Sequence, residues 1–146
     1  MKKMFAGSRE QTAEVQLLWQ CAETKCPHIL PIVETYMEDD TCYIVTKFLA
    51  GGNLYEMMTK QPNKRLPEPI ARKLFKKLAL GLAGLKQRLI IHRDIKPLNI
   101  LLGDQTSDAN LYIADFGISA LLRDEEDTRT LYIGTSGFTA PEVIKR

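Results

Sequence analysis

A short segment near the middle of the chain combines three residue types that can do chemistry. An acid, a cation and an amide, Asp94, Lys96 and Asn99, stand close together, and aliphatic runs at 89–91 and 100–102 flank them. A carboxylate can accept a proton, an ammonium can neutralise negative charge, and an amide oxygen can bind a hard cation. Buried strands on both sides would hold these groups in place, so that they need not be ordered during a reaction.

Two further motifs follow this segment in chain order. The triplet Asp-Phe-Gly begins at Asp115, sixteen residues after Asn99, and the triplet Ala-Pro-Glu begins at Ala140, twenty-five residues after Asp115. Between the first two motifs, the apolar runs 100–102 and 111–114 predict two short strands joined by a polar loop. One triplet alone would be weak evidence for a protein family, whereas three motifs in this order argue strongly against a chance match to a family signature.

Together these motifs resemble the eukaryotic protein kinases. Residues 92–99 match the catalytic-loop signature H-R-D-x-x-x-x-N, and the two triplets resemble the family's magnesium-binding motif and the end of its activation segment. The resemblance implies an α+β, bilobal protein-kinase fold, with residues 1–48 as a remnant N-lobe and residues 49–146 as a partial C-lobe. It also implies an incomplete domain, because the sequence contains neither a G-x-G-x-x-G loop nor the later C-lobe helices.

The resemblance assigns a role to each residue of the chemical cluster. Phosphoryl transfer passes through a loose transition state, so positioning and charge neutralisation do most of the work. By resemblance, Asp94 accepts the proton of the substrate hydroxyl and Lys96 contacts the transferring phosphate. Asn99 and Asp115 supply oxygen ligands to magnesium. The expected catalytic residues are therefore Asp94, Lys96, Asn99 and Asp115, and the expected cofactors are ATP and Mg²⁺.

The same resemblance favours a protein substrate that carries serine or threonine. Lys96, in the pattern D-x-K-P-x-N, is typical of the serine/threonine-specific branch. Residues 134–138 resemble that branch's substrate-docking loop, in which Thr135 resembles the threonine that bonds the catalytic Asp and Lys. Arg93 resembles the arginine that binds a phosphorylated residue of the activation segment. The candidate phosphoacceptors are Thr128, Thr130 and Tyr132, and the sequence does not rank them.

The phosphate side of the nucleotide site is expected near the beginning of the chain. The family uses a strand lysine on the α- and β-phosphates, held by a helix glutamate. Lys3 is the predicted lysine, and Lys2 is the other candidate, because neighbouring side chains on a strand face opposite sides. Glu14 is the predicted partner and Glu10 the alternative.

The adenine and ribose contacts are expected further along the chain. The strand that ends near Leu49 resembles the strand and hinge against which adenine packs. Thr46 falls at the gatekeeper position, and Lys47 and Leu49 would offer backbone groups to the adenine edge. Leu101 would form the floor of the site, and Asn53 stands where many members have an acid that binds the ribose.

The elements that must position these groups follow from hydrophobic periodicity. Helices are predicted at about 9–23, from Asn53 to about 60 and from Pro67 to about 89, and strands at 2–5, 29–37, 42–49, 100–102 and 111–114. Gly81 and Gly84 weaken the longest helix, which predicts close packing against another element. His92 and Phe116 resemble the family's apolar spine, so His92 is predicted to be a core residue. After Gly117 the chain is predicted to be mostly irregular.

Composition excludes several classes of protein. Hydrophobic residues are 45% and charged residues 26% of the chain, which is typical of a soluble globular protein. The net charge of +2 is too small to indicate nucleic acid or a membrane surface as a partner. The sequence shows neither a membrane-spanning run nor a signal peptide. The three cysteines form no CxxC pair, which predicts free thiols in a reducing compartment, the cytoplasm or the nucleus.

Three functional interpretations remain at this stage. The first is a serine/threonine protein kinase, for which every catalytic residue expected within the span is present. The second is a truncated, pseudokinase-type binding module, because weak activity is expected where nothing closes over the phosphates. The third is a small-molecule phosphotransferase of related fold, a class that rarely has an Ala-Pro-Glu triplet. Subfamily stays open, because the spacing between Asn99 and Asp115 is similar to calcium/calmodulin-dependent-type kinases, whereas the sequence after Asp115 is closer to the kinase-cascade group.

Overall fold

The computed structural model describes residues 2–5, 9–39, 41–127 and 133–145. Its elements, in chain order, are β1 (Lys2–Phe5), α1 (Arg9–Glu23), β2 (Ile32–Glu38), β3 (Thr41–Thr46), α2 (Leu54–Thr59), the 3-10 turn η1 (Pro62–Lys64), α3 (Glu68–Lys86), β4 (Ile90–Ile91), the 3-10 turn η2 (Pro97–Asn99), β5 (Ile100–Leu102), β6 (Leu111–Ile113), β7 (Ala120–Leu121) and α4 (Pro141–Ile144). The architecture is α+β, as predicted.

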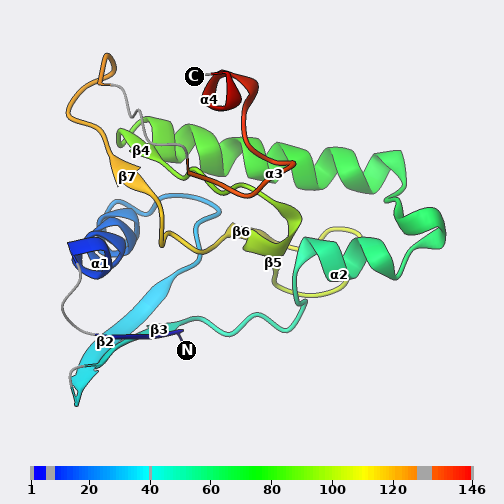
Figure 1. Ribbon diagram of the computed structural model, residues 1–146. Helices are drawn as coiled ribbons and strands as arrows, with labels where there is room; N and C mark the ends of the chain where they lie inside the picture. The colour runs from blue at the N-terminus through cyan, green and yellow to red at the C-terminus, as the bar shows by residue number, and fades with distance from the viewer. Residues whose placement is uncertain (1, 6–8, 40, 128–132, 146) are drawn as a thin grey trace.

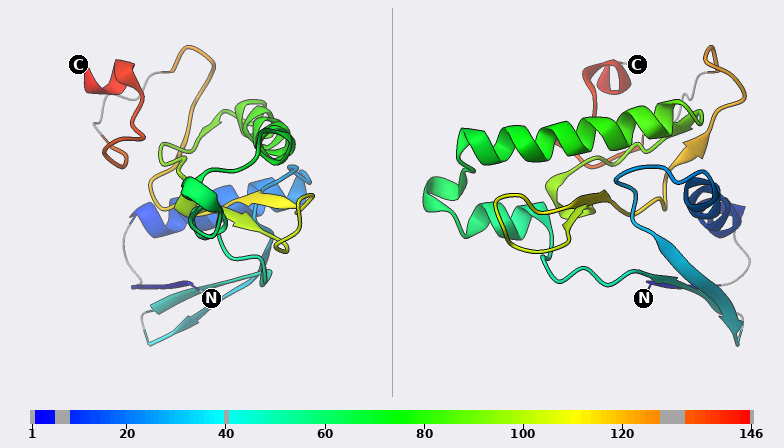
Figure 2. Two further views of the ribbon diagram at one scale, coloured as in Figure 1. Left: turned by 90° about the vertical axis from the view of Figure 1, so that its right-hand side faces the viewer. Right: turned by 180° about the vertical axis from the view of Figure 1, so that it is seen from behind.

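Three antiparallel sheets are distributed over two ends of the molecule. The largest has the strand order β1-β3-β2, and it lies with α1 at one end (Figures 1 and 2). The long helix α3 and the shorter α2 lie at the other end, with the two-stranded sheets β4-β7 and β5-β6 close to α3. The catalytic loop predicted from the sequence runs between β4 and β5, and therefore between two small sheets.

Two strand boundaries differ from the prediction. β2 begins at Ile32 rather than at Ile29, because Pro31 has no N–H for the ladder and Ile29 forms a parallel bridge to Ile113 instead. β3 ends at Thr46 rather than at residue 49, and the N–H of Lys47 donates to the carbonyl of Pro31 (3.0 Å). The partners that decide these boundaries, Ile113 for Ile29 and Pro31 for Lys47, are distant in the chain. Hydrophobic runs alone therefore could not predict either boundary.

Helix α3 packs closely against the segment that precedes β2. A Cβ on Gly81 would lie 2.9 Å from Ile113 Cδ1, and a Cβ on Gly84 would lie 2.7 Å from Cys26 Sγ. This contact confirms the reason expected for the two glycines. The helix ends at Lys86, earlier than predicted, because the chain turns through Leu89 (φ 57°) to enter β4. The two-residue strand β7 was also not predicted.

Replacing Gly81 with alanine should destabilise the fold. The substitution gains up to about 1 kcal/mol of helix propensity, but crowding of buried Ile113 costs about 1–3 kcal/mol, so we expect a lower urea midpoint. The control is Gly103→Ala, whose Cβ would lie 3.6 Å from the nearest side-chain atom. Equal midpoints for the two variants would contradict the close-packing explanation.

The three cysteines are free thiols, as predicted, and two of them are buried where α1 meets α3. Burial raises the pKa of Cys21 to about 12 and also raises that of Cys26. Within the described ranges, no helix is both long and apolar enough to cross a membrane.

Candidate active site

A closed triangle of polar contacts surrounds the carboxylate of Asp94. Lys96 Nζ lies 2.7 Å from Asp94 Oδ2, and the Thr135 hydroxyl donates to Asp94 Oδ1 (2.5 Å). Lys96 Nζ also donates to Thr135 Oγ1 (2.7 Å), which closes the triangle. Thr135 therefore makes both contacts, with Asp94 and with Lys96, that the family resemblance implied. The carboxylate is fixed by one residue of its own loop and by one from a segment about forty residues away.

Asn99 fixes the other side of the same loop. Its amide nitrogen donates to the backbone oxygen and to Oδ2 of Asp94, both at 2.9 Å. Because the nitrogen is directed at Asp94, the amide oxygen is the atom that can face a cation. The backbone oxygen of Asn99 accepts from the N–H of Ala114 (2.9 Å), which places Asn99 next to the residue before Asp115. The structure thus brings the acid, the amide and the Asp-Phe-Gly triplet together.

The environment of Asp94 keeps its carboxylate ionised. Burial alone would raise the pKa of Asp94, but hydrogen bonds from Lys96, Thr135 and Asn99, together with the Lys96 charge, hold it below its ordinary value of 3.8. The group is therefore an acceptor throughout the neutral range. An ionised carboxylate held by three donors can orient a hydroxyl group without rearranging first.

His92 is a core residue, as predicted, and its hydrogen bonds support the catalytic loop. Its Nε2 lies 3.0 Å from the carbonyl of Ala114, and the N–H of Asp94 donates to its Nδ1 (3.2 Å). These partners require the neutral tautomer with the proton on Nε2. The ring meets Phe116 edge-on, with centroids 4.9 Å apart and an interplanar angle of 70°. Burial lowers the pKa of His92, which matches this neutral form.

His92 should make the fold less stable at mildly acidic pH. Its pKa is lower in the folded chain than the ordinary 6.5, so the unfolded chain binds more protons and stability falls as pH drops below 6.5. We expect the slope of unfolding free energy against pH in this range to be smaller in His92→Phe than in the wild type. Urea titrations at several pH values measure it. Both proteins retain His28, so parallel slopes would contradict this role of His92.

A cavity of about 270 Å³ lies beside the catalytic loop, between α1 and β3. It brings together three of the predicted nucleotide-site residues, Glu14 on α1, Thr46 at the end of β3 and Asp115. Glu14 is buried, with 2% of its surface exposed, and is thus held away from bulk water. The apolar residues Leu18 and Ile44 also line the cavity.

Asp115 lies at the edge of this cavity and is accessible. It has φ 64°, and the N–H of Gly117 donates to its Oδ1 (3.4 Å). Within the described residues, no group of three or more His, Cys, Asp or Glu side chains is arranged to hold a metal ion. Two oxygen-bearing side chains, Asn99 and Asp115, fit a cation such as Mg²⁺, which keeps several of its ligands from water and from phosphates.

Other predicted contacts of the nucleotide lie outside this cavity. The N–H of Lys47 donates to the carbonyl of Pro31, so the carbonyl of Lys47 is the group that could face adenine. Leu101 lies in β5, half-buried, and forms a bridge with Asn53. The side chain of Asn53 caps α2, because its oxygen accepts from the N–H of Glu56 (2.9 Å) and its nitrogen donates to Glu56 Oε1 (2.8 Å). Asn53 is therefore held by the helix cap, and Leu49 lies in the extended segment that leads to it.

The predicted phosphate-binding lysine can be placed only by strand register. Lys3 lies opposite Tyr43 and Lys2 lies opposite Ile44 in the β1-β3 pair. The side chains of residues 1–12, including Lys3 and Glu10, fall outside the described part of the structure, so the Lys3–Glu14 pair stays a prediction.

The activation segment is described only in part. The three candidate phosphoacceptors, Thr128, Thr130 and Tyr132, lie outside the described residues. Arg93 Nε donates to the carbonyl of Ile118 (2.5 Å), one of the contacts that join this segment to the loop. Two hydroxyl groups that support these segments were not predicted. Ser119 donates to the carbonyl of His92 (3.1 Å), and Thr139 donates to the carbonyl of Thr135 (3.0 Å). Only their nearness to the motifs could have suggested them.

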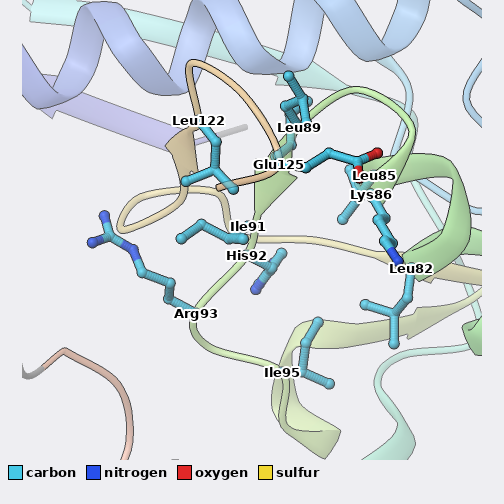
Figure 3. Close-up of a pocket in the computed structure, with 11 residues that line it drawn as sticks. Leu82, Leu85, Lys86, Leu89, Ile91, His92, Arg93, Ile95, Leu122 and Glu125 are labelled. Carbon is cyan, nitrogen blue, oxygen red and sulfur yellow. The ribbon is translucent and has the colours of Figure 1, made fainter. Parts of the chain in front are cut away.

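A larger cavity, of about 460 Å³, lies on the other side of the catalytic loop and carries different chemistry. Figure 3 shows aliphatic side chains of Leu82 and Leu85 from α3, Ile91 from β4, and Leu122 gathered around it. Its lining is mostly apolar and includes neither Asp94 nor the other predicted catalytic residues. We therefore place the candidate active site at the smaller cavity, which Glu14 and Asp115 line, and at the adjoining catalytic loop.

Comparison with known proteins agrees with this arrangement. The chain is 38% identical to CBL-interacting protein kinase 4 of Oryza sativa subsp. japonica over 123 residues, which cover 82% of this chain and 26% of that protein. It is 39% identical to CBL-interacting serine/threonine-protein kinase 7 of Arabidopsis thaliana over 121 residues, covering 82% of this chain and 27% of the relative. It is 31% identical to a calcium/calmodulin-dependent protein kinase of Metarhizium anisopliae over 147 aligned positions, covering 100% of this chain and 37% of the relative.

The chain thus spans about a quarter to a third of the length of these relatives. The protein kinase domain family matches it over residues 1–146, which is its whole length. With the catalytic-loop triangle and the adjoining Asp-Phe-Gly triplet, this match assigns the chain: it belongs to the protein kinase domain family.

Proposed function

We propose that this chain contributes the catalytic segment of a serine/threonine protein kinase, which transfers the γ-phosphate of ATP to a protein hydroxyl. The observation that carries the proposal is the triangle of Asp94, Lys96 and Thr135, to which Asn99 is joined. A carboxylate that is ionised, desolvated and aimed by three donors suits a group that must orient a substrate hydroxyl. One relative, which is named as a serine/threonine-protein kinase, supports the substrate class.

The residues divide the work in a simple way. Asp94 accepts the hydroxyl proton of the substrate as the new oxygen–phosphorus bond forms and the bond between the γ-phosphorus and the β–γ bridging oxygen breaks, so that ADP leaves. Lys96, whose Nζ lies beside Asp94, adds positive charge where negative charge develops. Asn99 and Asp115 would hold Mg²⁺, which when bound neutralises the charge of the phosphates. Glu14 and Thr46 line the cavity next to these groups and would bound the nucleotide there. Residues 1–48 and 49–146 would then form the two sides of the cleft.

The proposal is tested with γ-labelled ATP and paired peptides. The full chain, with Mg²⁺, should label a peptide whose only hydroxyl is serine or threonine more strongly than the matched tyrosine peptide, and omitting Mg²⁺ should remove the label. Labelling of tyrosine alone would reject the serine/threonine assignment. Labelling of small molecules but of neither peptide would favour a small-molecule phosphotransferase.

A pseudokinase-type binding module is the alternative from another class. It shares the fold but does not transfer phosphate. The intact set Asp94, Lys96, Asn99 and Asp115 argues against it, because a module that acts by contact alone has no need of all four. Binding of ATP by the full chain without any transfer to protein would favour this alternative.

The choice between Lys2 and Lys3 as the residue that contacts the phosphates is open to experiment. Lys2 is opposite Ile44 and Lys3 is opposite Tyr43 in the β1-β3 pair. The side chains of both lysines fall outside the described part of the structure, so the register does not choose between them, and Lys3 stays the predicted residue.

Alanine substitution of each lysine decides between them. We expect Lys3→Ala to lower kcat/KM for ATP by about 10- to 100-fold, because a phosphate contact to an ammonium is lost, and Lys2→Ala to change it by less than about threefold. Each variant is the matched control of the other. The opposite order of effects would assign the phosphate contact to Lys2 instead.

A further inference from the structure

The C-terminal end of α1 is joined to α3 by the guanidinium of Arg88. Its Nε donates to Thr24 Oγ1 (2.5 Å), one terminal nitrogen donates to the carbonyl of Thr24 (2.8 Å), and the other donates to the carbonyl of Gly84 (2.8 Å). Thr24 directly follows the last residue of α1 and is itself tied to that helix, because its hydroxyl donates to the carbonyl of Gln20 (2.7 Å). One planar cation thus binds the ends of two helices at once.

The positive charge of Arg88 complements the partial negative charge at the C-terminal end of α1. The C-terminus of a helix carries a partial negative charge, which a nearby cation stabilises. The last turn of α1 contains no basic residue, whereas the last turn of α3 contains Lys86. Arg88, which lies two residues after the end of α3, therefore supplies the cation that the last turn of α1 lacks. Its charge also opposes the burial-driven rise in the pKa values of Cys21 and Cys26, so it lies close to both buried thiols.

Helix α1 carries the part of the nucleotide cavity that a tilt of the helix would displace. Glu14 and Leu18 line that cavity from α1, together with Thr46 and Asp115 from other parts of the chain. Glu14 is buried, so small changes in the helix axis alter what its carboxylate contacts. A fifteen-residue helix moves as a unit, and fixing its last turn restricts the position of its middle.

We propose that Arg88 is a positioning residue, which fixes the end of α1 against α3 and thereby keeps Glu14 at the wall of the nucleotide cavity. Its effect on ATP use rests on the proposed function, whereas its effect on α1 does not. An arginine is required because three acceptors, two on Thr24 just after α1 and one on Gly84 of α3, must be reached by one rigid, planar group. The contacts with Thr24 are exposed to solvent, so they should influence helix position more than overall stability.

The test compares Arg88→Ala, Arg88→Lys and the control Arg72→Ala in the full chain. Arg72 lies in the first turns of α3 and makes an exposed pair with Glu68 (3.0 Å), remote from the end of α1. Trp19, the one tryptophan of the sequence, lies on α1 and reports its environment. Acrylamide quenching of its fluorescence measures the helix, and KM for ATP measures the nucleotide site.

We expect Arg88→Ala to increase Trp19 quenching and to raise KM for ATP by about 3- to 10-fold, with melting temperature nearly unchanged. Arg88→Lys should restore only part of both effects, and Arg72→Ala should show neither. If Arg88→Ala does not fold, Thr24→Val removes one acceptor and should shift both readouts in the same direction. Unchanged Trp19 quenching, or increased quenching with an unchanged KM, would overturn the inference.

A failure of the proposed function has a different signature. It would appear as a wild-type chain that binds no ATP with Mg²⁺ and transfers no phosphate. The Trp19 comparison between Arg88→Ala and Arg72→Ala would then still decide whether Arg88 fixes α1, because it requires no nucleotide.

Discussion

Replacing Asp94 with asparagine should lower kcat by about 10²- to 10⁴-fold, the loss typical of removing a general base. Asparagine keeps the shape of the side chain, but it cannot accept the hydroxyl proton. KM for ATP should change little, because Asp94 does not line the nucleotide cavity. Steady-state transfer to a serine peptide, with both substrates varied, measures the two constants separately.

Two comparisons keep this prediction specific. Asp108→Asn, in an exposed loop where the carboxylate pairs with Lys77 (3.3 Å), should leave kcat within about twofold of the wild type. The pH dependence supplies the second comparison. Because the pKa of Asp94 is below 3.8 in the folded chain, its ionised form stabilises the fold above that pH, and this stabilisation is lost as pH falls through the folded pKa. A wild-type rate that declines between pH 6 and 4.5 with the protein still folded would show that Asp94 is not the group that limits it.

Replacing Asp115 with asparagine should lower kcat/KM for ATP by about 100-fold or more, because a cation ligand loses its charge. Asp115 is accessible, and the N–H of Gly117 that donates to its Oδ1 can also donate to an amide oxygen, so the fold should persist. The informative measurement is a Mg²⁺ titration at fixed ATP. We expect Asp115→Asn to need far more Mg²⁺ for half-maximal activity, whereas Asp94→Asn should keep the wild-type requirement.

The matched control for this variant is Asp104→Asn. Asp104 accepts hydrogen bonds from the N–H and hydroxyl of Thr106 in an exposed turn, away from the cavity. Its Mg²⁺ requirement should equal that of the wild type. If Asp115→Asn also retained the wild-type requirement, the cation would have to be held elsewhere, and the assignment of Asn99 and Asp115 as ligands would be wrong.

Local signals predicted much of the fold. The helix α2 begins after its Asn53 cap as expected, since a side chain that caps the next residues depends only on near neighbours. The long helix α3 and the strand pair β5-β6 likewise follow from apolar spacing over a few turns. Where the prediction was wrong, at the start of β2 and at the end of β3, the competing partners were Ile113 and Pro31, which lie far along the chain or across a hairpin.

The sequence by itself determined the family and the catalytic loop, because Asp94, Lys96 and Asn99 are so close in the chain that no long-range contact is needed to bring them together. Only the tertiary structure decided which distant residues join them. Thr135 closes the triangle, Glu14, Thr46 and Asp115 line one cavity, and Arg88 reaches Thr24. These contacts span tens of residues and depend on how helices and sheets pack, and side-chain packing in three dimensions leaves no periodic trace in the order of the amino acids.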